Sequence, residues 1–192
     1  MESRYLEIRR LLLDAVLIAL AVSLATVLHT IGGKVAGSMW VPMWWGPFLA
    51  GLLLGPIHGL VVGFLTPFVS FLIRGLPPFP FWLIFSIEIG IYGFMWGALS
   101  LLLSKFMKLG YIRCLLSSLI GIVVGKLSAA LVLMLIIPSL VPKMAPTFLD
   151  AFMIVLVKWT LTSLPGIILI VVGGPFVVLT VKRLMPTLVR SD

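Results

Sequence analysis

Three charged residues stand inside long apolar runs of this sequence. Glu88 lies in the run 81–104, Lys126 in the run 112–137 and Lys158 in the run 148–181. Because a charge at membrane depth is costly, such side chains usually face the protein interior and find a partner there. A pair between Glu88 and one lysine leaves the other lysine to bind an anionic group on a ligand. The alternative is an ion pair that only fixes the packing of the helices.

Sequence patterns typical of catalysis are absent. The chain has no HExxH, no Gly-x-Ser-Gly with a histidine partner, no paired-aspartate motif and no GxxxxGK[ST] phosphate loop. Its two histidines, His29 and His58, make a metal site improbable, and the single Cys114 excludes an internal disulfide. We predict a protein that is not an enzyme, that uses no cofactor and that cannot hydrolyse ATP by itself.

The composition is that of an integral membrane protein. Of the 192 residues, 61% are hydrophobic and 10% are charged, and the mean hydropathy is +1.27. The net charge of +8 lies mostly in short segments between apolar runs. That distribution indicates membrane topology and argues against nucleic-acid binding.

The apolar runs predict an all-α bundle of six transmembrane helices that forms a single membrane domain over residues 1–192. Both ends are expected in the cytoplasm, since cytoplasmic segments carry an excess of Lys and Arg. Nine basic residues fall inside under this topology and three outside. The inside set is Arg4, Arg9, Arg10, Lys105, Lys108, Arg113, Lys182, Arg183 and Arg190, and the outside set is Lys34, Arg74 and Lys143. The predicted helices are 11–29, 41–54, 57–74, 81–104, 112–137 and 148–181.

The stretch 40–80 departs from an ordinary pair of spans. Gly46-Pro47, Gly55-Pro56 and Thr66-Pro67 interrupt it, and tryptophans crowd its start. Irregular backbone at membrane depth survives only where protein covers it or where it lines a cavity. We therefore predict short or kinked second and third helices beside a ligand pocket. Alternatively, the glycines only allow close helix packing.

The segment TIGGKVAGSM, residues 30–39, is too polar to span a membrane. We predict an external loop whose glycines, Gly33 among them, permit backbone conformations closed to other residues. Such a loop either folds over a ligand as a lid or is an inert connector.

Small residues mark one face of the first helix. Ala15 and Ala19 are four residues apart and share a face, and Ala21 with Ala25 repeats the spacing. Small side chains let another helix approach closely. The face either docks a partner or packs inside the bundle.

Two of these patterns resemble one family, the substrate-binding S components of energy-coupling factor (ECF) transporters, which import vitamins into prokaryotes. Ala15-x-x-x-Ala19 resembles the Ala-x-x-x-Ala motif by which the family docks on its transmembrane coupling subunit. The run 48–63, FLAG followed by GPxxGLxxG, resembles the family's segment between helices 2 and 3. The resemblance implies a multi-pass protein of the prokaryotic cell membrane that works with a coupling subunit and two ATPase subunits.

The resemblance also implies a site near the external face, built by helices 4 to 6 and covered by the loops after helices 1, 3 and 5. Two membrane lysines favour a carboxylate-bearing vitamin such as pantothenate or niacin, and a pyridoxine or pyrimidine ring on Glu88 is the alternative. Function hypotheses from other classes are a self-sufficient carrier and an intramembrane enzyme. The predicted substrate-binding residues are Glu88, Lys126, Lys158, Trp40, Trp44, Tyr92, Trp159 and Gly33. If the charged trio is structural, the site is sought among Trp40, Trp44, Trp45, Trp82, Tyr92 and Trp159.

Overall fold

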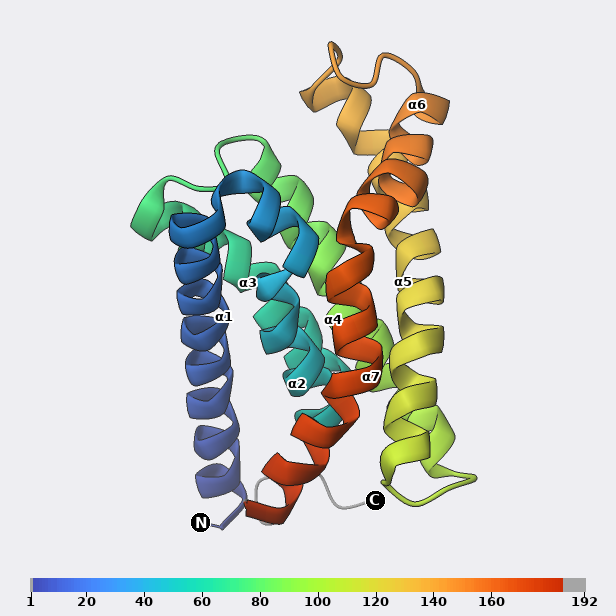
Figure 1. Cartoon of the computed structure of the whole chain (residues 1–192). Helices are drawn as coiled ribbons and strands as arrows, with labels where there is room; N and C mark the ends of the chain where they lie inside the picture. The colour runs from blue at the N-terminus through green and yellow to red at the C-terminus, as the bar shows by residue number, and fades with distance from the viewer. Residues whose placement is uncertain (1, 185–192) are drawn as a thin grey trace.

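The computed structural model describes residues 2–184, and these residues form helices and no strands (Figure 1). The predicted all-α class is confirmed. The elements are α1 (Glu2–Trp40), η1 (Pro42–Trp44), α2 (Trp45–Leu54), α3 (Pro56–Arg74), α4 (Phe81–Ser104), α5 (Tyr111–Leu140), α6 (Phe148–Met153), η2 (Ile154–Trp159) and α7 (Thr160–Leu184).

Five helices within the described residues are long and apolar enough to cross a membrane. They comprise most of α1, then α3, α4, α5 and the continuous helix that runs through α6, η2 and α7. The predicted span 41–54 is instead the 3-10 turn η1 followed by α2, which has 10 residues. A helix of that length rises about 15 Å, roughly half of the hydrocarbon core. The described residues therefore contain five candidate spans, and the predicted count of six is not confirmed.

The predicted loop 30–39 is helical, which corrects the sequence-based interpretation. α1 continues to Trp40, and its one break is Gly33, whose φ of 64° and ψ of −162° lie outside the helical region. Figure 1 shows the arm 34–40 turning back at this break. A Cβ at Gly37 would collide with the His29 ring, so the glycine lets the arm pack closely on α1. Gly33 thus allows the bend, and Gly37 allows the close contact with His29.

The two ends of the bundle differ in the connections they carry. In Figure 1 the start of α1, the end of α7 and the 105–110 connection lie at one end, while the 75–80 and 141–147 connections lie at the other. Lys105 and Lys108 therefore share an end with the first turn of α1, opposite Lys143. This agrees with the predicted grouping of basic residues, of which Arg190 lies outside the described residues. The side of the membrane on which each end lies stays a prediction.

The centre of the bundle depends on glycine contacts between α2, α3 and α4. Gly59 of α3 and Gly93 of α4 face each other so closely that a Cβ on either would collide with the other's carbonyl. Gly51 of α2 approaches the same Gly93 carbonyl, which a Cβ there would meet at 2.6 Å. Glycines in this region therefore do allow close helix packing, the alternative considered for them.

The last span is one helix with a local change of winding. Thr147 and Asp150 form a capping box at its start, in which each side chain bonds the other residue's backbone N–H. Residues 154–159 then form a π-helical segment before regular α-helix resumes at Thr160. π-Helical segments widen a helix locally and often occur at functional sites.

Candidate functional site

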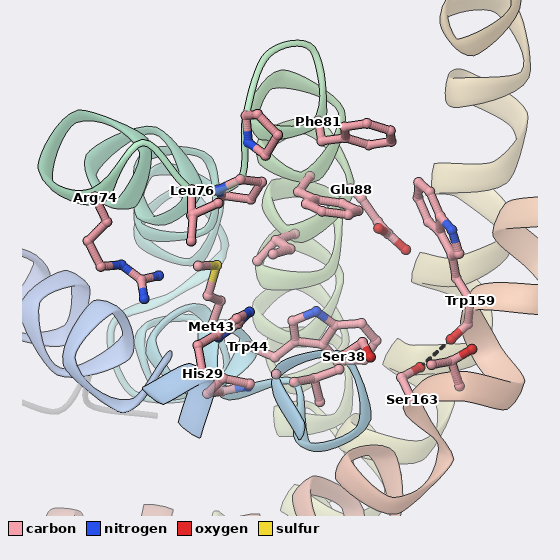
Figure 2. Close-up of a pocket in the computed structure, with 18 of the residues that line it drawn as sticks. His29, Ser38, Met43, Trp44, Arg74, Leu76, Phe81, Glu88, Trp159 and Ser163 are labelled. Atoms are coloured by element: carbon pink, nitrogen blue, oxygen red, sulfur yellow. Dashed lines mark hydrogen bonds between the residues drawn. The ribbon is translucent and has the colours of Figure 1, made fainter. Parts of the chain in front are cut away.

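A cavity of about 470 Å³ opens between the arm after Gly33, the 76–78 connection, α4 and the η2–α7 helix (Figure 2). Its wall combines aromatic and aliphatic side chains with a few polar groups. The lining residues are His29, Gly37, Ser38, Val41, Pro42, Met43, Trp44, Arg74, Leu76, Pro77, Pro78, Phe81, Phe85, Glu88, Ile89, Lys158, Trp159, Thr162 and Ser163. A volume of this size fits a small organic molecule.

Glu88 is the acidic residue of the cavity wall, and its charge is balanced from behind. Lys126 Nζ lies 2.8 Å from Glu88 Oε1, and the Tyr92 hydroxyl donates to the same oxygen at 2.9 Å. Glu88 and Lys126 are only 4% and 5% exposed. Because both charges are buried, each depends on the other for compensation.

Aromatic rings enclose this ion pair on its inner side. Lys126 Nζ lies 5.8 Å from the centre of the Trp44 ring and 5.6 Å from that of Tyr92, within reach of cation–π attraction. The Trp44 and Tyr92 rings are themselves 4.6 Å apart, and Trp96 and Phe48 continue the cluster. The aromatic cluster keeps water from the pair and fixes the position of Glu88 at the cavity wall.

Lys158 and Trp159 reach the cavity from the π-helical segment η2. Trp159 packs against Phe85 of α4, with ring centres 5.2 Å apart. Lys158 is exposed, and no carboxylate among the described side chains pairs with it. One of the two membrane lysines therefore pairs with Glu88, and the other is unpaired at the cavity.

The predicted substrate-binding residues separate into three groups. Four of them line the cavity: Glu88, Lys158, Trp44 and Trp159. Lys126 and Tyr92 lie one layer behind Glu88. Gly33 and Trp40 are outside the lining: Gly33 is the bend of α1, and Trp40, at the end of the arm, is 41% exposed.

The remaining tryptophans of the alternative set lie elsewhere. Trp45 packs edge-on against Phe48, and Trp82 stacks against Phe71 and contacts Phe68. Neither lines the cavity, so the aromatic wall comes from Trp44 and Trp159, with Phe81 and Phe85.

Sequence reasoning missed several polar groups of the cavity. In the sequence, Arg74 indicates only an external basic residue and His29 only a possible metal ligand, and no pattern marks the hydroxyls of Ser38, Thr162 and Ser163. All five line the cavity. One signal could have identified Arg74 as a site residue. It is the last residue of the predicted helix 57–74, and the resemblance implies that the loop after this helix covers the site.

A strained backbone position also borders the cavity. Val41 has φ 43° and ψ 51°, a left-handed conformation that a β-branched residue rarely adopts. Its side chain is buried and lines the cavity together with Pro42. This geometry directs the chain from the helical arm into η1 and so sets one wall of the site.

The polar groups of the cavity can bind a small molecule. The Thr162 and Ser163 hydroxyls donate to backbone carbonyls of their own helix, at 2.9 Å and 2.7 Å. No group of three or more His, Cys, Asp or Glu among the described side chains is placed to hold a metal ion. The arrangement offers one neutralised carboxylate, two unpaired cations and an aromatic wall to a small molecule.

A second candidate surface is the outer face of α1. Ala15 and Ala19 are exposed, whereas Ala21 and Ala25 are fully buried. Asp14 points inward instead, and its Oδ2 lies 2.7 Å from His58 Nδ1 at the start of α3. This contact ties α1 to α3 and fixes which face of α1 is left outside. Internal packing therefore accounts for the second alanine pair and not for the first.

The comparisons with known proteins agree with this description. A family model described as the substrate-specific component of ECF transporters matches residues 9–178. No curated protein and no solved structure gave a significant match. The match covers all five candidate spans in whole or in large part, and the cavity lies entirely within it. This chain is a multi-pass membrane protein that belongs to the family of substrate-specific components of ECF transporters.

Proposed function

We propose that this chain is the subunit that captures a small water-soluble vitamin or precursor for an ECF-type importer of the prokaryotic cell membrane. It binds the substrate in the cavity between α1, α4 and the η2–α7 helix. A transmembrane coupling subunit and two ATPase subunits then supply the work of transport. The whole chain acts as one membrane domain, with both ends in the cytoplasm and the cavity at the external side.

One observation carries the proposal: a cavity of about 470 Å³ whose wall holds a charge-balanced Glu88 and an unpaired Lys158. Because Lys126 already neutralises Glu88, Lys158 and Arg74 leave an excess of positive charge in a largely apolar site. A ligand carboxylate would supply the missing negative charge. This favours pantothenate or niacin over pyridoxine or a pyrimidine precursor, which would instead use Glu88 as an acceptor for ring substituents.

The first prediction concerns binding by the isolated chain. Purified without other subunits, it should carry a small molecule that mass spectrometry identifies after denaturation. Ser38→Trp should abolish this binding, because Ser38 is exposed into the cavity and a tryptophan would fill it. Val35→Trp is the matched control, since Val35 lies on the same arm, 67% exposed and outside the lining.

Loss of the molecule in both variants, or in neither, would contradict the assignment of this cavity. A purified chain that holds no small molecule and binds none of pantothenate, nicotinate, pyridoxine, thiamine, riboflavin or biotin would contradict the proposed function.

A further inference from the structure

We propose that Arg74, at the end of α3, is the residue that anchors the acidic group of the substrate. This inference rests on the proposed function and deepens it, because it locates the carboxylate in the cavity. It assigns Lys158 a lesser part than the sequence suggested.

Arg74 is held in the cavity wall by a buried hydroxyl. Its Nη2 donates to Ser70 Oγ at 2.7 Å, and Ser70 is fully buried. The Ser70 hydroxyl in turn donates to the Leu76 carbonyl at 2.6 Å, so it can only accept from the arginine. These two hydrogen bonds fix the guanidinium between the end of α3 and the connection that follows it. Figure 2 shows the guanidinium directed toward Met43 at one side of the cavity.

The guanidinium is not satisfied by these contacts. Its Nε is buried and has no hydrogen-bond partner, and no carboxylate among the described side chains pairs with Arg74. An arginine has five N–H donors, and a carboxylate can accept two of them side by side. An arginine oriented from behind and unpaired toward a cavity is suited to an anionic ligand.

The opposite side of the cavity has the complementary polarity. Figure 2 places Trp159 and Ser163 across from Arg74, with the Glu88 carboxylate directed toward Trp159. The hydroxyls of Ser163, Thr162 and Ser38 each donate their one hydrogen to a backbone carbonyl, at 2.7, 2.9 and 3.0 Å. These hydroxyls and Glu88 therefore present acceptors to a ligand.

The two sides together define the class of ligand. Its acidic group is placed at Arg74, and a hydroxyl or amine that can donate lies near Glu88 and Ser163. The body between them contacts the rings of Trp44, Phe81 and Phe85. The inferred substrate is thus a small carboxylate that carries a hydrogen-bond donor at its far end.

Lys158 is less suited to hold the acid. Its side chain is exposed, whereas Arg74 is half-buried and fixed by Ser70. Exposed ion pairs contribute little because water and salt screen them. A lysine also offers a single flexible ammonium in place of a planar fork that matches a carboxylate. Lys158 would attract an anion to the cavity more than it would retain it.

The test compares acids with neutral analogues of the same shape. Calorimetry would measure pantothenate against panthenol, and nicotinate against nicotinamide, on the unchanged chain and on Arg74→Gln, Lys158→Met and Lys108→Gln. Arg74→Gln should weaken the bound acid by about 10- to 100-fold, which is the value of a lost charged hydrogen bond, and leave its neutral analogue within a few-fold. Lys158→Met should weaken the acid by about fivefold or less. Lys108→Gln removes an exposed cation at the other end of the bundle and should change neither.

A larger loss for Lys158→Met than for Arg74→Gln would overturn the inference. So would binding of panthenol or nicotinamide as tightly as the matching acid. If neither acid binds, the molecule that mass spectrometry recovers from the purified chain decides. Two results would overturn the role of Arg74 and leave the proposed function intact. One is recovery of a neutral molecule, and the other is recovery of an acid that Arg74→Gln retains in full. An acid that Arg74→Gln loses supports the inference.

Should Arg74→Gln fail to fold, Arg74→Lys supplies the same test. It keeps the charge but cannot offer two parallel N–H donors, so affinity for the acid should still fall several-fold. Unchanged affinity for the acid in Arg74→Lys would contradict anchoring by the guanidinium.

Discussion

Lys126→Met is expected to destabilise the ligand-free protein by about 3–5 kcal/mol, the cost of leaving one member of a buried ion pair uncompensated. Lys126 and Glu88 lie 2.8 Å apart and are almost fully buried. Once the ammonium is removed, the Tyr92 hydroxyl is the remaining hydrogen-bond donor to Glu88 among the described side chains. Glu88→Gln should also destabilise, because it strands the ammonium between Trp44 and Tyr92.

The double variant should recover much of that loss, since it removes both charges and leaves no buried charge uncompensated. Thermal and chemical unfolding of the four proteins in detergent, without ligand, would measure the effect. Lys158→Met is the matched control, because Lys158 is exposed and should change stability by less than about 1 kcal/mol. Single variants as stable as the unchanged protein would refute the role of the pair in the fold.

Ligand affinity of the restored double variant separates the two roles of Glu88. If Glu88 contacts the ligand, affinity should remain reduced by roughly 1.5–3 kcal/mol although stability has returned. If affinity returns together with stability, Glu88 serves the helix packing alone.

Ala15→Trp and Ala19→Trp are expected to prevent assembly with the coupling subunit while ligand affinity stays unchanged. The two alanines are exposed on α1 and share a face, so a partner helix can approach closely only while both side chains are small. The cavity includes neither residue, which is why binding should survive. Co-purification with a tagged coupling subunit would measure assembly, and calorimetry would measure affinity.

Val27→Trp is the control on the same helix. Val27 is 53% exposed and lies roughly a third of a turn away from Ala15 around the axis. A tryptophan there tests whether any bulky residue on α1 blocks assembly. Co-purification that survives both alanine substitutions, or that Val27→Trp also abolishes, would show that the docking face is assigned wrongly.

Regular helices of spanning length were predictable from hydropathy alone. The predicted ranges 57–74, 81–104 and 112–137 match α3, α4 and α5 within a few residues. The largest difference is at the end of α5, which continues through Pro138 to Leu140 instead of ending before the proline. Glu88 and Lys158 stood out as charges inside apolar runs, and both line the cavity. That the predicted residues bind the substrate stays a prediction.

The departures lie where tertiary contacts override local preference. Residues 30–39 read as a loop by their glycines, yet His29 supports the arm through Gly37 and helix continues to Trp40. Lys126 and not Lys158 pairs with Glu88 because of how α5 is rotated against α4. The hydropathy pattern of the sequence does not reveal that rotation. In the sequence, Arg74 indicates only a basic residue in an external segment. Its place in the cavity wall depends on the bonds from Arg74 to Ser70 and from Ser70 to the Leu76 carbonyl, and the second forms only once the chain after α3 folds back.

The most direct measurement is uptake into liposomes of the compound that the purified chain retains. Liposomes that contain this chain with its coupling subunit and two ATPases should accumulate the compound against a gradient only when ATP is supplied. Liposomes that contain the chain alone should bind the compound and accumulate none, since the sequence has no nucleotide-binding loop. Accumulation against a gradient by the chain alone would contradict the account and identify a self-sufficient carrier.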